Sequence, residues 1–230
     1  MSQHNYRHEN NAHHWSKKMK RKLKVLSLCD FTGNMLKPWA EAGHDCLALD
    51  IQHSIRKGEE GKLVDGIRFR WADIRTLTPD DLPPPDIIFT FPPCQNLALS
   101  GSSDFKRKGI QGLIDGLSLV ESCRKLCQWY GVPWMLENPM SRLSTCWRKP
   151  DHKFDPWQYG ETYQKQTWLW TGGGFIMPPP EIEDKPEYVT ERILDLSPGP
   201  QRKMLRSATP LGFARAVYQS NRFLESMVAA

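Results

Sequence analysis

Short runs of apolar and β-branched residues alternate with polar or helical stretches along the chain. The strand-like runs cover residues 24–29, 46–50, 67–74, 87–91, 133–139 and 168–170. A helical pattern occupies 35–40, and a longer one places apolar residues on one stripe at Ile110, Leu113, Leu117, Val120, Cys123 and Cys127. A last helix is expected over 211–224, with Phe213, Ala216, Val217 and Phe223 facing the core. The repeated order of strand, turn and helix indicates an open α/β sheet.

The run 87–91 is apolar or β-branched throughout, which predicts a strand buried on both faces. Pro92 and Pro93 end it, because neither can donate a hydrogen bond to a strand ladder. Cys94 therefore follows on a rigid turn at the carboxyl end of a strand, the edge of an open α/β sheet where ligands bind. A thiol held there is a candidate nucleophile, and a buried, inert cysteine is the alternative.

Acidic residues stand near the ends of the neighbouring strands. The first strand runs into the turn 30–34, where Gly33 would let the backbone approach a nucleotide-type ligand at the start of a helix. Asp50 ends the second strand 17 residues after Gly33, which suits an acid that binds a ribose, although an aspartate there can equally cap a helix. Asp73 lies near the end of the third strand. Together these positions suggest one cofactor edge.

Two further features point to the same edge. Glu137 lies near the end of the fifth strand, and in a parallel sheet that end lies beside Cys94. A carboxyl group desolvated there can share a proton with a heteroaromatic ring. Residues 101–109 are rich in glycine, serine and positive charge, which favours a flexible loop that closes over a phosphate backbone; a plain surface loop is the alternative.

Composition and charge divide the chain into two parts. With 230 residues, 39% of them hydrophobic and 25% charged, we expect one domain over 23–230 and a disordered tail over 1–22. Residues 1–24 carry seven basic side chains against Glu9 alone, a charge of +6 that suits either binding to nucleic-acid phosphates or a solubilising leader. Six cysteines without a CxxC pair, and no apolar leader or long apolar span, favour a reducing cytoplasm, no structural metal and no membrane span.

Three stretches together resemble a known family. Phe-Pro-Pro-Cys-Gln at 91–95, Glu-Asn-Pro at 137–139 and the opening strand with its Gly33 turn and helix are similar to the S-adenosylmethionine-dependent DNA cytosine-5 methyltransferases. The similarity runs in order over nearly the whole chain after the tail. It implies a Rossmann-like class I methyltransferase fold, with a largely parallel sheet and helices on both faces. It also implies S-adenosyl-L-methionine as the cofactor and DNA as the partner.

The resemblance implies a role for each matching residue. Cys94 matches the nucleophile that adds to C6 of cytosine, and Glu137 matches the carboxyl group that contacts N3. Gln164–Thr167 stands where the family carries an arginine motif, so Lys165 is expected to contact O2 of the base. The residues expected to bind the cofactor are Asp30, Phe31, Thr32, Gly33, Asp50, Ile51, Asp73, Ile74, Pro92 and Ser207.

The region expected to read DNA sequence is short. Only about 35 residues separate the late aromatic strand from the final motif, and the segment 175–200 is rich in proline and acids. We expect a reduced recognition region that contacts one or two bases around the target cytosine, with residues 101–109, Trp147 and Trp157 supplying shape and stacking contacts.

Other functions stay open from the sequence alone. A methyltransferase that acts on an exocyclic amino group also uses a Pro-Pro turn, but it has an aromatic residue where Cys94 stands. A catalytically silent nucleic-acid-binding protein is a further alternative, because the first turn carries fewer glycines than is usual in the family. A cysteine hydrolase is the weakest, because no histidine shows a pairing signature with Cys94. The sequence favours no particular oligomeric state.

Overall fold

The computed structural model describes residues 21–54, 61–189, 191–192, 199 and 207–227. Most of the expected tail, residues 1–20, lies outside these residues, as do parts of the expected recognition segment at 190, 193–198 and 200. Arg21 and Lys22, which we expected in the tail, instead form ion pairs with Asp86 and Asp45. None of the helices in the described part of the chain is long and apolar enough to cross a membrane.

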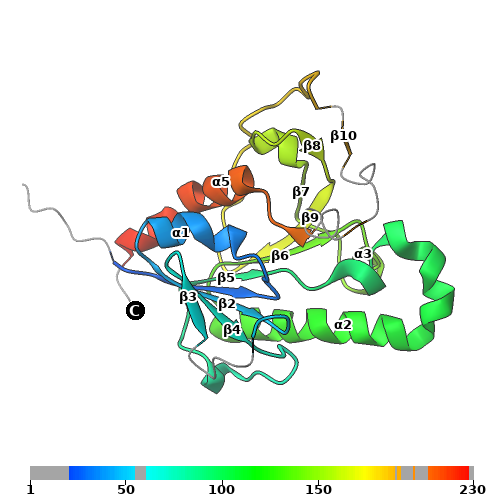
Figure 1. Ribbon diagram of the computed structural model, residues 1–230, viewed down its shortest axis with the longest axis horizontal. Coiled ribbons are helices and arrows are strands. Elements are labelled where there is room, and N and C mark those ends of the chain that lie inside the picture. The colour runs from blue at the N-terminus through cyan, green and yellow to red at the C-terminus, as the bar shows by residue number, and fades with distance from the viewer. Residues whose placement is uncertain (1–20, 55–60, 190, 193–198, 200–206, 228–230) are drawn as a thin grey trace, which may run out of the picture.

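A mixed sheet organises the molecule (Figure 1). Within the described residues it has eight strands in the order β3-β4-β2-β1-β5-β6-β9-β7. The five strands β4, β2, β1, β5 and β6 are mutually parallel. At one edge β3 pairs antiparallel with β4, and at the other β9 pairs antiparallel with β6 and with β7. The bounds are β1 Lys24–Leu28, β2 Asp45–Asp50, β3 Lys62–Val64, β4 Ile67–Trp71, β5 Ile87–Thr90, β6 Trp134–Pro139, β7 His152–Phe154 and β9 Thr167–Gly172.

Helices cover both faces of this sheet, as the sequence predicts. Buried side chains of α1 (Lys37–Glu41) and α5 (Leu211–Asn221) pack against one face in a core that includes Trp39, Phe89 and Phe213. Those of α2 (Phe105–Tyr130) and α3 (Leu143–Cys146) pack against the other face. A second, two-stranded sheet pairs β8 (Tyr163–Gln164) with β10 (Glu191–Arg192). The molecule is therefore an α/β protein with a mostly parallel sheet.

The central strands form where the sequence predicts them because their residues are apolar on both sides. The four residues of β5 are completely buried, and β1 buries all but its first residue. Such strands can only be accommodated inside a sheet that is covered on both faces. The third expected strand ends earlier, at Trp71, so Asp73 and Ile74 follow β4 rather than belong to it.

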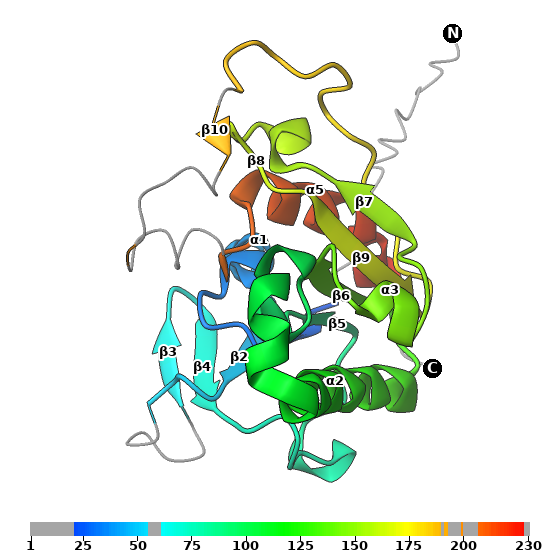
Figure 2. The ribbon, with the colours of Figure 1, turned by 90° about the vertical axis from the view of Figure 1, so that its right-hand side faces the viewer.

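The expected flexible loop over residues 101–109 is wrong. The chain is helical over Leu99–Asp104 and continues directly into α2, which bends near its start (Figure 2). Gly109 has a φ of 62° and a ψ of −161°, a conformation open almost only to glycine, and it breaks the helical repeat. Ile110 therefore lies off the predicted stripe and is 77% exposed, whereas Val120, Cys123 and Cys127 are buried as expected.

The last helix also differs from its prediction. Phe213, Ala216 and Val217 are buried as predicted, but α5 ends at Asn221 and a 3₁₀ turn follows over Arg222–Ser226. The tighter turn changes which side chains face the core. Phe223 is consequently 38% exposed, and Leu224 takes the buried position.

Candidate active site

The order of the strands reverses at β1, and the predicted site lies there. From β1 the chain builds outward to β2 and β4 on one side and to β5 and β6 on the other. In sheets of this kind ligands bind outside the carboxyl ends of the strands at the point of reversal. The structure brings Asp30, Asp50, Cys94 and Glu137 to this edge, because they lie at or just after the carboxyl ends of β1, β2, β5 and β6.

The turn after β1 is held by the buried carboxylate of Asp30. This carboxylate accepts hydrogen bonds from Ser27 Oγ at 2.8 Å, Thr32 Oγ1 at 3.2 Å and the backbone N–H of Gly33 at 2.7 Å. Burial raises the pKa of Asp30, and the three donors offset part of that rise. Cys29, just before it, has a φ of 55°, which a non-glycine residue rarely adopts. The turn is thus a strained but well-connected structure.

Gly33 is required in this turn for two reasons. Its φ of 66° lies in the left-handed region, and a Cβ atom there would come within 2.7 Å of the Phe69 ring. The short helical segment that follows is also tied to the end of the chain, because Asn34 Nδ2 donates to the backbone oxygen of Thr209 at 3.0 Å. This bond holds Thr209, two residues after Ser207, against the opening turn. Ser207 itself is exposed.

The end of β2 presents a second buried carboxylate. Asp50 Oδ1 accepts hydrogen bonds from the backbone N–H of Gln52 at 2.7 Å and from Gln52 Nε2 at 3.2 Å. Ile51, beside it, is 53% exposed. A fixed carboxylate next to an exposed apolar side chain suits a ligand that carries both hydroxyl groups and a planar ring.

The third expected cofactor acid is already paired. Arg75 donates to both carboxylate oxygens of Asp73, from Nε at 2.9 Å and from a terminal nitrogen at 2.8 Å, and these bonds lower the pKa of Asp73. Ile74 is buried in the core under this segment. Asp73 therefore reaches the edge of the site as part of an ion pair.

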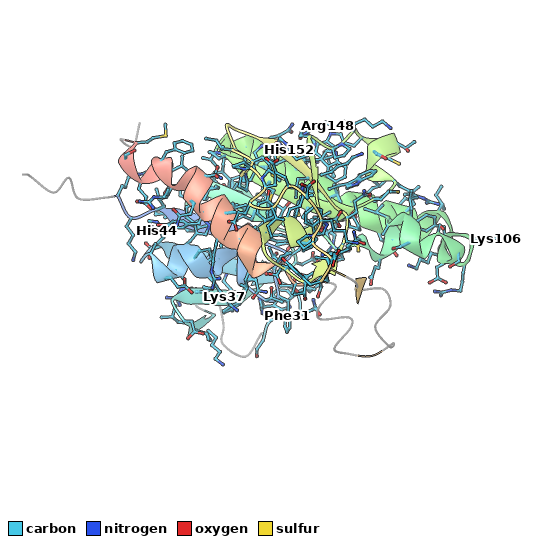
Figure 3. The ribbon with its side chains drawn as sticks, turned by 90° about the horizontal axis from the view of Figure 1, so that it is seen from above. Phe31, Lys37, His44, Lys106, Arg148 and His152 are labelled. Carbon is cyan, nitrogen blue, oxygen red and sulfur yellow. The ribbon has the colours of Figure 1, made fainter. Side chains whose placement is uncertain are left out.

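Aromatic rings line the expected cofactor edge, after the ends of β1 and β2. Phe31 is 54% exposed, and its ring stacks on His53 with the ring centres 5.5 Å apart and the planes at 18°. His53 meets the ring of Phe69 edge-on at 5.3 Å. Figure 3 shows Phe31 far from His44, which lies at the opposite end of the strands. The sequence prediction included Phe31 but missed His53, since a lone histidine three residues after an acid carries no motif.

Cys94 stands on a short 3₁₀ turn, Cys94–Asn96, directly after the two prolines. The backbone N–H of Phe91 still donates to Leu28 at 2.9 Å, so β5 is held beside β1 up to the prolines. The backbone oxygen of Cys94 accepts from Leu97 at 2.8 Å and Ala98 at 2.7 Å, which fixes the turn. Its side chain is half-buried.

Three of the other thiols are poor nucleophiles. A hydrogen bond with Cys123, followed by burial, raises the pKa of Cys29 well above its ordinary value. Burial raises the pKa of Cys46 to about 12 and raises that of Cys127 as well. Because the thiolate is the reactive form, these three cysteines are kept protonated.

Glu137 lies near the end of β6, next to the strand that leads to Cys94, and pairs with Lys165. Lys165 Nζ is 3.8 Å from Glu137 Oε1, and both side chains are largely buried. At that distance the charges attract each other without forming a hydrogen bond. Among the described residues, Oε1 is buried and has no hydrogen-bond partner. This oxygen of the carboxylate is thus an acceptor that lacks a hydrogen-bond donor.

A small pocket opens against this carboxylate. Its volume is about 10 Å³, room for about one water molecule. It is lined by residues from five parts of the chain, namely Phe91, Glu137, Phe154, Lys165, Thr167, Thr209, Pro210 and Phe213. The pocket brings the predicted Glu137 and Lys165 together, while Cys94 lies outside its lining. A planar ligand that contacts both Glu137 and Cys94 would have to widen this pocket.

Asn138 connects the segment that carries Glu137 to the turn that carries Cys94. Its Nδ2 donates to the backbone oxygen of Pro92 at 3.0 Å. This bond ties the residue after Glu137 to the Pro-Pro turn that carries Cys94. The sequence motif contains Asn138, but only the structure shows that it fixes the distance between the two strand ends.

Trp157 and Trp147 were both expected to supply stacking contacts to DNA. Trp157 is 9% exposed, which corrects its expected role in stacking, because its ring is covered by the fold. Trp147 is half-buried and stacks on Trp170 with the ring centres 6.1 Å apart, while the guanidinium of Arg148 lies 4.8 Å from the Trp147 ring centre. Within the described residues no cluster of histidine, cysteine and acidic side chains is arranged to hold a metal ion.

Models of known protein families do not match this chain, and a search of curated proteins finds no match either. Function has to be inferred from the residues and their geometry.

Proposed function

We propose that this protein is a DNA methyltransferase that transfers a methyl group from S-adenosylmethionine to C5 of cytosine through a covalent bond between Cys94 and the base. The observation that carries the proposal is the buried acceptor Glu137 Oε1, which has no hydrogen-bond donor among the described residues and lies 3.8 Å from Lys165 Nζ. Glu137 stands on β6, next to β5, the strand that leads to Cys94. A cytosine protonated at N3 supplies the missing donor, and its C6 needs a nucleophile such as a cysteine thiolate.

The fold supports this proposal. The five parallel strands follow the order 3-2-1-4-5 when numbered along the chain, which is the order of doubly wound, Rossmann-like sheets. Such sheets bind nucleotide cofactors at the carboxyl end of the first strand, where Asp30 and Gly33 form the opening turn.

The residues at this end fit S-adenosylmethionine. We assign Asp50 Oδ2 to the ribose hydroxyls, because Gln52 already occupies Oδ1. The exposed ring of Phe31 and the side chain of Ile51 suit the faces of the adenine. When bound there, the cofactor supplies a methyl group on a positively charged sulfur.

The chain's own groups make cytosine reactive. Cytosine C5 is too weak a nucleophile alone, so the Cys94 thiolate bonds to C6 and the electron pair of the C5–C6 bond moves toward C5. Glu137 holds the proton on N3 that balances this charge, and Lys165 lies close enough to contact O2. After C5 has gained the methyl group, loss of the C5 proton restores the C5–C6 bond and expels the thiolate.

The target cytosine has to leave the base stack, because neither C5 nor C6 can be reached inside a duplex. Two half-buried basic side chains, Lys108 and Arg142, lie beside the segment that follows Cys94. Lys108 Nζ donates to the backbone oxygen of Gln95 at 2.5 Å, and the Arg142 guanidinium lies 3.6 Å from the centre of the Phe105 ring. We assign this surface to the phosphate backbone of DNA.

Product analysis tests the proposal. Purified full-length protein is incubated with DNA and isotopically labelled S-adenosylmethionine, and the digested nucleosides are identified by mass spectrometry. We expect label in 5-methylcytosine, and we expect Glu137→Gln to lower the initial rate at least about 100-fold because proton transfer to N3 is lost. The exposed Glu183→Gln serves as a matched control and should keep full activity. Label in an exocyclic-amino product, or no label in DNA, would contradict the proposal.

A further inference from the structure

The imidazole of His53 makes three contacts that no motif predicts. Its ring lies parallel to Phe31, edge-on to Phe69, and its Nε2 is 3.2 Å from the backbone oxygen of Asp30. A carbonyl oxygen only accepts hydrogen bonds, so Nε2 is the protonated nitrogen and donates. The backbone N–H of His53 in turn donates to the backbone oxygen of Asp50 at 3.3 Å. One residue thus contacts both strand ends that carry the proposed cofactor site.

These contacts join two segments that strand pairing leaves separate. The pairing of β1 with β2 ends at Leu28 and Leu49, and the Asp30 N–H then donates to the backbone oxygen of Leu49 at 3.2 Å. Beyond that point the turn at Asp30 and the loop after Asp50 are linked by the His53 side chain. Its bond to Asp30 spans 23 positions in the sequence.

The aromatic rings form a continuous column from the sheet to the surface. Phe69 projects from β4 beneath Gly33, where a Cβ atom would clash with it at 2.7 Å. His53 rests on Phe69, and Phe31 lies outermost and 54% exposed. Because His53 covers one face of the Phe31 ring, the other face is the one presented to a ligand.

We infer that His53 is a positioning residue of the cofactor site. It holds the Phe31 ring and the Asp30 turn at a fixed distance from Asp50, so that a purine and its ribose meet both at once. The ligand class is a nucleoside with a planar purine ring and ribose hydroxyls. The inference rests on the proposed function, and it adds a residue whose role is to organise the contacts before the ligand arrives.

A role in positioning predicts a loss of affinity rather than of chemistry. His53→Ala removes the hydrogen bond and both ring contacts, and we expect the Kd for S-adenosylmethionine to rise about tenfold. His53→Phe keeps a stacking ring, and His53→Gln keeps a donor amide; each should raise the Kd about threefold. Turnover at saturating cofactor should stay within about twofold of the unmutated protein, since the His53 ring contacts Phe31, Phe69 and Asp30, none of which is expected to bond to cytosine.

Calorimetric titration of the full chain with S-adenosylmethionine, together with thermal unfolding without ligand, decides the matter. His152→Ala is the matched control, a half-buried histidine on β7 at the far edge of the sheet. A His53→Ala Kd within twofold of the unmutated value, or an equal rise in the His152 variant, overturns the inference alone. If His53→Ala does not fold, an unchanged Kd in His53→Phe and His53→Gln overturns it equally. No binding to the unmutated protein removes the proposed function and this inference together.

Discussion

At the scale of single residues, the most informative group is the carboxylate of Asp30. It is 4% exposed and is bonded to three local donors. Desolvation raises its pKa in the folded protein above the ordinary 3.8. A group whose folded pKa is raised contributes stability below its unfolded pKa, and that contribution is lost as the pH rises through the folded pKa.

We therefore predict that the difference in unfolding free energy between the unmutated protein and Asp30→Asn depends on pH. As the pH rises from 3.8 through the raised pKa, the unfolding free energy of the unmutated protein should fall relative to that of the variant, which cannot titrate. Replacing the carboxylate also weakens its hydrogen bonds, at a pH-independent cost of about 1 kcal/mol per bond.

Urea unfolding of both proteins between about pH 4 and about pH 8 measures this difference. Ser27→Ala, which retains the titrating group, serves as the control and should follow the unmutated protein more closely. The contrary result is an unfolding free energy of the unmutated protein, relative to Asp30→Asn, that stays constant or increases as the pH rises. Either behaviour would show that burial does not raise the pKa of Asp30.

At the scale of elements, the bend in α2 sets where the basic side chains at its start are presented. Gly109 creates the bend, and no atom lies within 4 Å of where its Cβ would be. Replacement by alanine is therefore opposed by backbone strain alone, about 1 to 3 kcal/mol for a conformation that only glycine adopts readily.

Gly109→Ala should lower the unfolding free energy by about that amount, or straighten α2 and displace residues 99–108. Gly101→Ala is the matched control, because Gly101 has an ordinary φ of −106° and its nearest contact, Gln95 O, would be 3.9 Å from a Cβ. Denaturant unfolding and circular dichroism measure both outcomes. Equal stability of the two variants, with unchanged helicity, would mean that Gly109 carries no strain.

The same element shows how far sequence patterns predict this fold. The buried stripe at Val120, Cys123 and Cys127 was predictable, because spacings of three and four residues define a helix face. The helical structure over residues 99–108 was not predictable, because glycine and serine favour loops. This segment is held by backbone hydrogen bonds to the residues that follow β6. The Leu99 N–H donates to Met140, and the Arg142 N–H to Leu97. Such bonds between distant segments leave no periodic signal.

The candidate site divides in a similar way. Cys94 and Glu137 were predictable because prolines and a carboxylate end apolar strands of a parallel sheet. The column of Phe69, His53 and Phe31 depends on side-chain directions on β4 and after β1 and β2. The ion pair of Asp73 with Arg75, two residues later, depends on side-chain directions in the segment that follows β4. No spacing in one sequence fixes those directions.

At the scale of the whole molecule, two apolar cores on opposite faces hold the sheet, and one edge of that sheet gathers the polar groups. The core that contains Trp39 and Phe213 also contacts Phe91, while the other contains Leu97 and Leu143. The strand ends that carry Cys94 and Glu137 are therefore packed against an apolar core on each face of the sheet. Rigid placement of this kind is what a covalent step between a thiol and a ring requires.

The central claim is that Cys94 forms a covalent bond to cytosine, and trapping that bond tests it most directly. DNA that carries 5-fluorocytosine cannot lose its C5 substituent after methyl transfer, so the bond between Cys94 and C6 should persist. With S-adenosylmethionine present, we expect a complex with the unmutated protein that survives denaturing electrophoresis. Cys146→Ala, which removes an exposed thiol, should give the same complex, and Cys94→Ala should give none. A trapped complex with Cys94→Ala, or none with the unmutated protein, would contradict the account.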